Sequence, residues 1–143
     1  MNRAGSGDSG SLFAASEFIP LKKVLVPERI LRMRQVASQI YVDERIKTYI
    51  LDIVFATRSP EESRLDLKRL IRFGASPRAS IGILCAARAH AFLKGRGFVV
   101  PDDIKKVAAD VLHHRILLTY EAEAEGVRAD DLVQRILQTV PAP

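Results

Sequence analysis

The stretch Gly74-Ala75-Ser76-Pro77-Arg78-Ala79-Ser80 decides the fold of this chain, and it predicts the start of a helix. Serine is a preferred residue at a helix N-cap. Proline suits the first helical position, because its missing N–H would have no partner there. We therefore expect Ser76 as the N-cap and Pro77 as the first residue of a helix that runs to about Lys94, with Gly95 as its C-cap.

Arg78 falls in the first turn of this helix, where a cation is disfavoured. The N-terminal end of the helix dipole is positive, so a cation there costs roughly 0.3–1 kcal/mol. Two interpretations follow. Arg78 and the helix start together face an anion such as a phosphate, or Arg78 is a solvated surface residue for which the cost is small.

Length and composition predict one aliphatic domain with a tail. The chain has 143 residues, of which 48% are hydrophobic, 6% are aromatic and none is tryptophan. Residues 1–19 begin with a stretch rich in Gly, Ser and Ala and are expected to form a flexible N-terminal tail. Residues 20–143 are expected to form the folded domain.

Apolar residues recur at helical spacing through most of this domain. The fold class is therefore all-α, a helical bundle of about five helices with at most a small two-stranded ribbon. Phe98–Val100 and Ile116–Leu118 are expected to pair as that ribbon, and Glu121–Gly126 is expected to be a polar loop. Five helices are expected: Pro27–Tyr41, a helix from the N-cap Asp43 to Thr57, Pro77–Lys94, Pro101–Leu112 and Ala129–Val140. The inner face of the first is expected to begin at Ile30.

Charge and cysteine content bound the function only loosely. A net charge of +5 permits nucleic acid or phosphate ligands without requiring them. The single Cys85 cannot form an intramolecular disulfide, which fits a reducing compartment, and it is expected to be a buried thiol. No apolar run has the roughly 18 residues of a membrane span, and no signal peptide is evident, so a cytoplasmic protein is expected.

Motifs for catalysis or metal binding are not found in the sequence. Three histidines and one cysteine, without metal-ligand spacing, predict no metal site. The glycines at 5, 7 and 10 formally match a dinucleotide fingerprint but lack the flanking strand and helix. The helices Pro77–Lys94 and Asp102–Leu112 could form a helix–turn–helix, with the ribbon of Phe98 and Leu117 as a small wing. Such an arrangement would be a nucleic-acid-binding module. Asp102 and Asp103 at the start of the second helix would repel phosphates, which argues against nucleic acid.

From Pro20 to Pro143 the chain resembles the C-terminal lid domain of MoxR-type AAA+ ATPases. The segments that carry the resemblance keep their order and spacing over most of the chain. They are Ala56-Thr57-Arg58, Gly74 to Ser80, Ala86-Ala87-Arg88-Ala89, Val100-Pro101-Asp102-Asp103-Ile104, Asp110 to Arg115 and Tyr120 to Gly126.

The resemblance implies that the domain packs over ATP held by a separate α/β core. Arg78 would then be the sensor 2 arginine that contacts the γ-phosphate, with Ala75, Ser76 and Pro77 shaping the helix start. The sequence contains no G-x-x-x-x-G-K-[ST] loop, so ATP and Mg would be bound mainly by the core domain, and no hydrolysis is expected from this chain alone.

The same resemblance implies a chaperone-like machine. Its partners would be its own core domain, the neighbouring subunits of a hexamer and proteins of von Willebrand factor A type. The client protein and the pathway cannot be read from the sequence. A plain protein-interaction module, which binds a partner through its helical faces, is a third class that the sequence leaves open.

Overall fold

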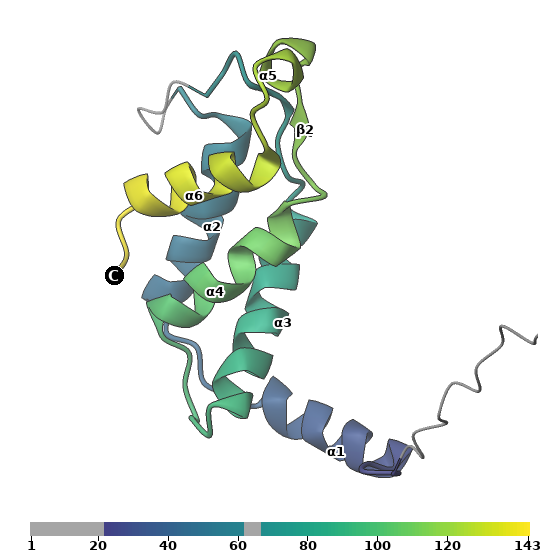
Figure 1. The fold of residues 1–143 in the computed structure, drawn as a ribbon. Coiled ribbons are helices and arrows are strands. Elements are labelled where there is room, and N and C mark those ends of the chain that lie inside the picture. Colours follow the sequence, from purple (N-terminus) through teal and green to yellow (C-terminus); the bar gives the residue numbers. More distant parts are fainter. Residues whose placement is uncertain (1–21, 62–66) are drawn as a thin grey trace, which may run out of the picture.

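The computed structural model describes residues 22–61 and 67–143, so the tail expected at residues 1–19 lies outside the described residues. Within them, the predicted all-α class is confirmed, with six helices and one two-stranded sheet (Figure 1). The elements are α1 (Pro27–Ser38), α2 (Glu44–Arg58), β1 (Ile71–Phe73), α3 (Arg78–Leu93), α4 (Pro101–Leu112), β2 (Leu117–Leu118), α5 (Tyr120–Ala124) and α6 (Ala129–Thr139).

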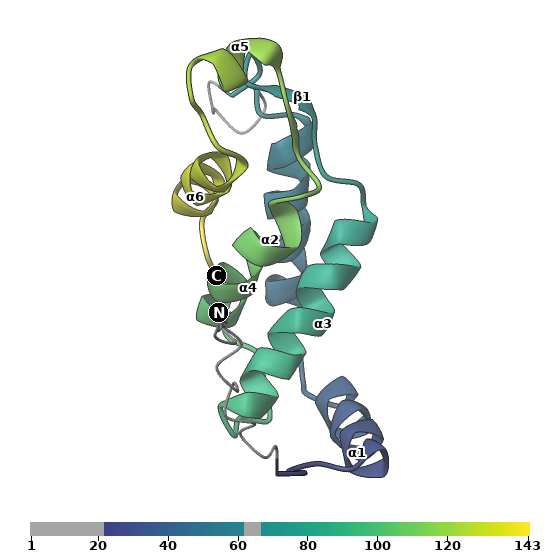
Figure 2. The same ribbon diagram turned by 45° about the vertical axis from the view of Figure 1, so that its right-hand side comes forward.

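Helix α3 is the centre of the arrangement. It contacts α1, α2 and α4, and its contact with α4 is the most extensive between any two elements described. Helices α2 and α3 run side by side in opposite directions, and α6 lies across α2 and α4 (Figure 1). The view in Figure 2 shows α1 at one end of the body and β1 with α5 at the other. The site discussed below lies where α2 ends and α3 begins.

The buried core is aliphatic apart from Tyr49, close to what the composition predicts. The predicted apolar stripes of α2 and α6 are both buried. Along α3 the buried residues recur every four positions at Ala79, Ile83, Ala87 and Ala91, and three of these four are alanines. Small side chains let α4 approach closely: a Cβ built on Gly82 would lie 3.2 Å from Cγ1 of Val111. The α3–α4 pair is therefore closely packed.

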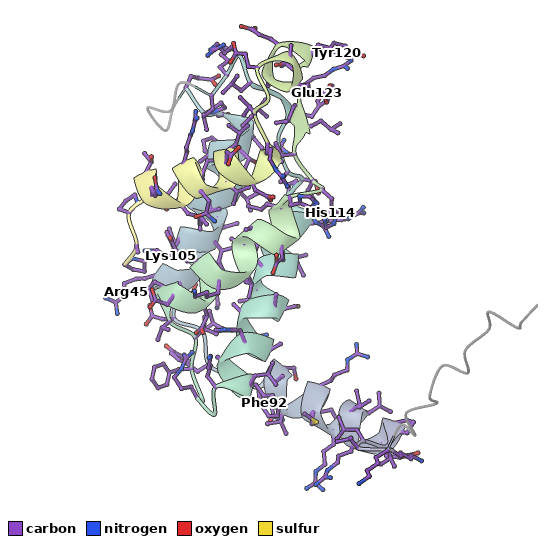
Figure 3. The ribbon with its side chains drawn as sticks, in the orientation of Figure 1. Arg45, Phe92, Lys105, His114, Tyr120 and Glu123 are labelled. Atoms are coloured by element: carbon purple, nitrogen blue, oxygen red, sulfur yellow. The ribbon has the colours of Figure 1, made fainter. Side chains whose placement is uncertain are left out.

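Helix α1 differs from the prediction. It ends at Ser38 rather than near Tyr41, and none of its residues is buried. Ile30, which was expected on an inner face, is 46% exposed, and Leu31 is 58% exposed. Figure 3 shows Phe92 of α3 beside α1, and Met33 and Val36 line the same crevice. Among the described elements, the one extensive contact of α1 is with α3, whereas α2, α3 and α4 each pack closely against two or more elements.

The predicted ribbon has the wrong partner strand. Strand β2 pairs antiparallel with β1, with Ile71 opposite Leu118, and Phe98 forms only an isolated bridge with Tyr41. The reason is geometric: Phe98 precedes α4 and Leu118 follows it. A helix of 12 residues separates the two segments by about 18 Å, so they cannot meet.

Two further expectations are wrong. The segment expected as a polar loop contains the short helix α5, whose N-cap Thr119 accepts a hydrogen bond from Ala122 N–H. Cys85 is exposed rather than buried, because it lies on the face of α3 away from the alanine stripe. None of the described helices has the length and apolar character that crossing a membrane requires.

Asp103, in the first turn of α4, holds the turn between α3 and α4 together. Its side chain is 1% exposed, and its two oxygens accept hydrogen bonds of 2.6 and 2.9 Å from the Arg96 guanidinium. The Val100 N–H donates at 2.8 Å, and Nδ1 of His90 lies 2.6 Å from Oδ1. Gly95, in the left-handed region at φ 70°, lets the chain turn after α3, whose C-cap is Lys94, one residue earlier than expected.

Burial alone would raise the pKa of Asp103, because it penalises the charged carboxylate. The hydrogen bonds from Arg96, the Val100 N–H and His90 outweigh burial and hold this pKa at about 2, below the ordinary 3.8. Between these values the unfolded chain binds a proton that the folded chain does not. The contribution of Asp103 to stability is therefore complete above about pH 4 and is lost as the pH falls toward 2.

We expect Asp103→Asn to lower the free energy of unfolding at pH 7 by about 2 kcal/mol or more, because Arg96 and His90 lose a buried charged partner. Between about pH 4 and pH 2, the free energy of unfolding should also decrease less in this variant than in the unaltered chain. Urea unfolding at a series of pH values measures both. The control is Asp102→Asn at the exposed neighbour, and an equal loss in that variant would contradict this account.

Candidate functional site

The candidate site is the loop between β1 and α3 together with the first turn of α3. Helix α3 begins at Arg78, with Pro77 rather than Ser76 at the N-cap, so the boundary lies one residue later than predicted. Pro77 nevertheless has helical backbone angles (φ −54°, ψ −25°), and Ala79 N–H donates to the Ser76 carbonyl at 2.8 Å. Among the described residues, the exposed Ser76 hydroxyl accepts no capping hydrogen bond, although the Ser76 carbonyl accepts the first bond of the helix.

The loop lies directly on the end of α2. A Cβ built on Gly74 would fall 2.2 Å from the Thr57 carbonyl oxygen, 2.5 Å from the Thr57 carbonyl carbon and 2.8 Å from Arg58 Cα. These distances are far below van der Waals contact, and the atoms belong to a helix backbone that cannot move aside. Gly74 is therefore required by this close approach of two backbones, which any side chain would separate.

A buried hydrogen-bonded chain fixes the next residue. Ala75 N–H donates to Thr57 Oγ1 at 2.9 Å, and that hydroxyl donates to the Val54 carbonyl at 2.7 Å. Thr57 and Ala75 are both fully buried. The Arg58 guanidinium adds a long contact of 3.4 Å to the Ala75 carbonyl. The C-terminal end of α2 thus positions the residue that lies three places before Arg78.

Arg78 itself is exposed, and within residues 22–61 and 67–143 its side chain makes no hydrogen bond or ion pair. The other five helices described all carry an acidic residue in the first turn, whereas α3 has none. Carboxylates suit the positive end of a helix dipole, and α3 instead presents a guanidinium there. This end of α3 therefore has two positive features and no counter-charge of its own among the described residues.

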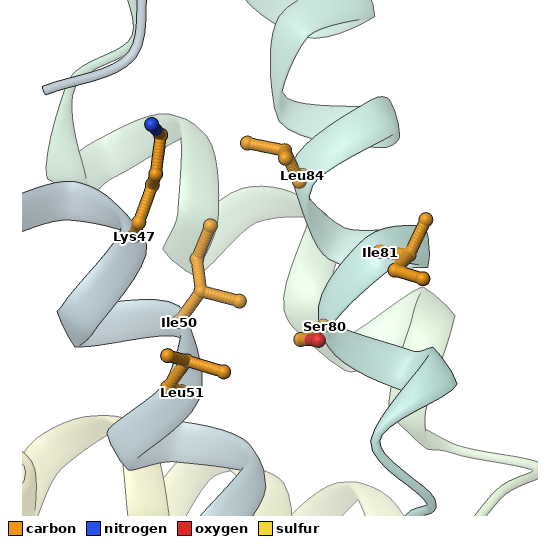
Figure 4. A pocket seen from close by; sticks show the side chains of 6 residues that line it. All are labelled: Lys47, Ile50, Leu51, Ser80, Ile81 and Leu84. Carbon is orange, nitrogen blue, oxygen red and sulfur yellow. The ribbon is translucent and has the colours of Figure 1, made fainter. Parts of the chain in front are cut away.

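A shallow groove begins next to the site, between α2 and α3 (Figure 4). Its wall on α3 starts two residues after Arg78. The residues that line the groove are Lys47, Ile50, Leu51, Ser80, Ile81 and Leu84. Four of these six are apolar, so the groove suits an apolar surface better than a triphosphate.

The acidic cluster that the sequence contains pairs with Arg69 rather than with Arg78. The acidic residues expected in a loop lie on α5 and at its C-cap, Glu125. Glu121 and Glu125 accept hydrogen bonds from Arg69 at 3.0 and 2.8 Å. Figure 3 shows Glu123 on the outer side of α5. For the nucleic-acid alternative, the proposed wing does not form, because β2 pairs with β1 and not with Phe98. The basis for a winged helix is therefore lost.

Thr57 is the one residue of the site that sequence reasoning missed. It belongs to the segment Ala56-Thr57-Arg58, but nothing in the sequence gave its side chain a role. The available signal is its place on the helix: Thr57 continues the apolar stripe of Ile46, Ile50 and Ile53 at the end of α2. A hydroxyl on a buried face needs a partner, and here that partner is the loop.

Comparison with known proteins identifies the class. The family described as AAA lid domain matches residues 64–136. The chain is 42% identical over 123 residues to Chaperone MoxR1 of Mycobacterium tuberculosis, a match that covers 85% of this chain and 33% of that protein. It is 36% identical over 115 residues to Protein MoxR of Paracoccus denitrificans, covering 76% of this chain and 34% of that one.

A solved structure agrees with these matches. The crystal structure of a Cytophaga hutchinsonii protein assigned as an ATPase superimposes with a TM-score of 0.79 and 41% identity, over 81% of this chain and 36% of that one. The chain belongs to the AAA lid domain family. More narrowly, it is the lid region of a MoxR-type AAA+ ATPase, as the resemblance implied. It spans about a third of the length of these relatives.

We expect Gly74→Ala to lower the free energy of unfolding by about 2 kcal/mol or more, because its Cβ would overlap the backbone of α2. Thermal and urea unfolding measure the loss. Gly97→Ala is the matched control, since a Cβ there meets nothing within 4 Å, and its effect should stay within about 1 kcal/mol of zero. Equal effects of the two substitutions would contradict the close contact described here.

Proposed function

We propose that this lid covers ATP bound in a separate core domain, and that Arg78 is the sensor 2 arginine that contacts the γ-phosphate. The observation that carries the proposal is the exposed guanidinium at the acid-free N-terminal end of α3, on a loop held by α2. A guanidinium and helix N–H groups both favour a phosphate, and a charge-assisted hydrogen bond is about twice as strong as a neutral one.

The proposed mechanism depends on the charge that hydrolysis removes. With ATP bound, the γ-phosphate offers Arg78 anionic oxygens in the planar geometry that a guanidinium matches. After hydrolysis and phosphate release, this ion pair is gone. The lid then loses one attachment to the core and is free to rotate. The α3–α4 pair would transmit that rotation as a rigid body, because both helices are closely packed.

This chain supplies only part of the proposed nucleotide site. Residues Gly74 to Ser80 contain no carboxylate that could hold Mg²⁺, and the neighbouring groove is mostly apolar. Of the parts of ATP, the phosphates are the ones whose charge and geometry the Arg78 guanidinium matches best. We infer that ATP and Mg²⁺ are bound mainly by the core domain, and that the chain does not hydrolyse ATP by itself.

The exposed face of α1 supports a proposed docking surface for that core domain. Ile30, Leu31 and Val36 of α1 are exposed apolar residues, and Val24 just before the helix is exposed too. Exposed apolar patches mark contact surfaces. The relatives are about three times as long as this chain, which leaves room for a core. Assembly into a hexamer, von Willebrand factor A-type partners and a chaperone-like role are proposed from the resemblance alone. A cytoplasmic location is proposed from the sequence composition described above.

To test Arg78, this chain can replace the matched region of Mycobacterium tuberculosis Chaperone MoxR1, and ATP turnover of the chimera can be measured. Arg78→Ala should lower turnover about tenfold or more, because the γ-phosphate loses a charged partner. Arg135→Ala on α6 removes the same charge from an exposed position and should leave turnover unchanged. Unaltered turnover in the Arg78 variant would overturn the sensor 2 role.

To test α1, the same chimera can carry Leu31→Asp, which places a charge on the proposed docking face. We expect ATP turnover to fall at least about threefold, while the melting temperature of the isolated lid changes by less than about 2 °C, because Leu31 is exposed. Leu117→Asp at the opposite end of the molecule is the control. Loss of turnover in both variants, or in neither, would contradict docking through α1.

A further inference from the structure

We propose that Thr57 is a positioning residue for Arg78: its hydroxyl fixes the loop before α3 and so sets where the guanidinium is presented. The functional meaning of this inference rests on the sensor 2 role proposed above. The placement itself rests on contacts between α2 and the loop. These contacts come from residues far apart in sequence, 18 positions between Ala75 and Thr57.

The hydroxyl has a fixed polarity. A threonine hydroxyl has one proton to donate and two lone pairs to accept with. The Thr57 hydroxyl donates a hydrogen bond to the Val54 carbonyl at 2.7 Å. Its oxygen therefore acts as the acceptor for Ala75 N–H at 2.9 Å. Both residues are fully buried. Water therefore cannot replace the hydroxyl, and without it the Ala75 N–H would be a buried donor with no partner.

The segment that carries Arg78 is held on both sides. Ala75 before it is bonded to Thr57, and Ala79 after it is fully buried in the α3 stripe. Between them lies Pro77, whose ring restricts the backbone. Arg78 is thus an exposed side chain on a backbone with little freedom. The Thr57 side chain contributes one buried hydrogen bond to the attachment at Ala75, beside the long contact from Arg58, and a nearly isosteric substitution removes that bond alone.

A second threonine of α2 separates positioning from a general effect on the helix. The Thr48 hydroxyl also donates to a carbonyl one turn back, that of Glu44, at 3.1 Å. It lies on the exposed side of the helix, away from the loop. If Thr57 acted only within α2, replacing either threonine by valine would have the same consequence. If Thr57 positions the loop, only its own replacement changes the start of α3.

The first test uses the full 143-residue chain and backbone ¹⁵N relaxation. In Thr57→Val, the amide order parameters of Ser76 and Arg78 should fall from about 0.85, typical of rigid backbone, to about 0.6 or less. Thr57→Ser, which keeps the hydroxyl, and Thr48→Val should retain the values of the unaltered chain. Unchanged order parameters in Thr57→Val, or an equal fall in Thr48→Val, would overturn the proposal.

Amide hydrogen exchange of the unaltered chain provides a test that does not depend on a variant folding. The Ala75 amide should exchange as slowly as the amides of buried residues in α2, because its donor is bonded and shielded from water. Exchange of Ala75 as fast as that of the exposed Ser76 would overturn the proposal.

A double-substitution cycle in the chimera connects positioning to ATP turnover. Thr57→Val should lower turnover to within about threefold of Arg78→Ala, Thr57→Ser should restore it, and the double variant should be no slower than Arg78→Ala alone. Additive losses would overturn action through Arg78. A loosened loop together with full turnover in Arg78→Ala would contradict the sensor 2 role while supporting the placement by Thr57.

Discussion

The contact between the end of α2 and the loop Gly74–Ala75 is the constraint on which the rest of the site depends. Ser76, Pro77 and Arg78 are all exposed, so their own side chains do little to fix where α3 begins. Their position comes from the backbone contact at Gly74 and from the hydrogen bond that Ala75 donates to Thr57. An arginine at the end of a long flexible side chain can register a phosphate only if its backbone is already in place.

The charge pattern of the helix ends gives this position its meaning. Acidic residues occupy the first turn of five of the six helices described, which is the arrangement that stabilises a helix. Helix α3 has no acidic residue in its first turn and carries Arg78 there instead. Arg78 lies between Ala75, which is bonded to Thr57, and the buried Ala79. A local departure from a stabilising rule, on an otherwise well-fixed backbone, is typical of a functional position.

Two other features suit a domain that moves as one body. Asp103 joins the last turn of α3 to the first turn of α4, so the two helices that carry most of the core contact keep a fixed relation. Helix α1 stands at one end with no buried residue, and its apolar side chains have little to contact within the described chain. A rigid body with an exposed apolar end fits a lid that works against another domain.

Much of the fold could be predicted from the sequence, and the failures have physical causes. Regular apolar spacing identified α2 and α6 and nearly all of their buried residues, because each helix buries one broad stripe. The partner of β2 was missed because strand pairing depends on where α4 directs the chain. Helix α5 was missed because five residues rich in glutamate give no stripe to recognise.

In the candidate site too, local features could be read from the sequence and tertiary contacts could not. Arg78 can be proposed from the sequence because a cation in a first helical turn conflicts with a local rule that can be read from sequence. Thr57 cannot be, because its role is a tertiary contact that no local pattern reports. Gly74 stood within the recognised segment, but the reason for a glycine there became visible only as a distance of 2.2 Å to the Thr57 carbonyl oxygen.

The most direct test is a structure of this chain joined to an ATPase core of the family, bound to magnesium and a non-hydrolysable ATP analogue. The distance to measure runs from the Arg78 guanidinium nitrogens to the γ-phosphate oxygens. A distance of about 2.7–3.0 Å, with Ala75 still bonded to Thr57, is the result that this account predicts. A guanidinium that faces solvent more than about 6 Å from the phosphate would contradict it.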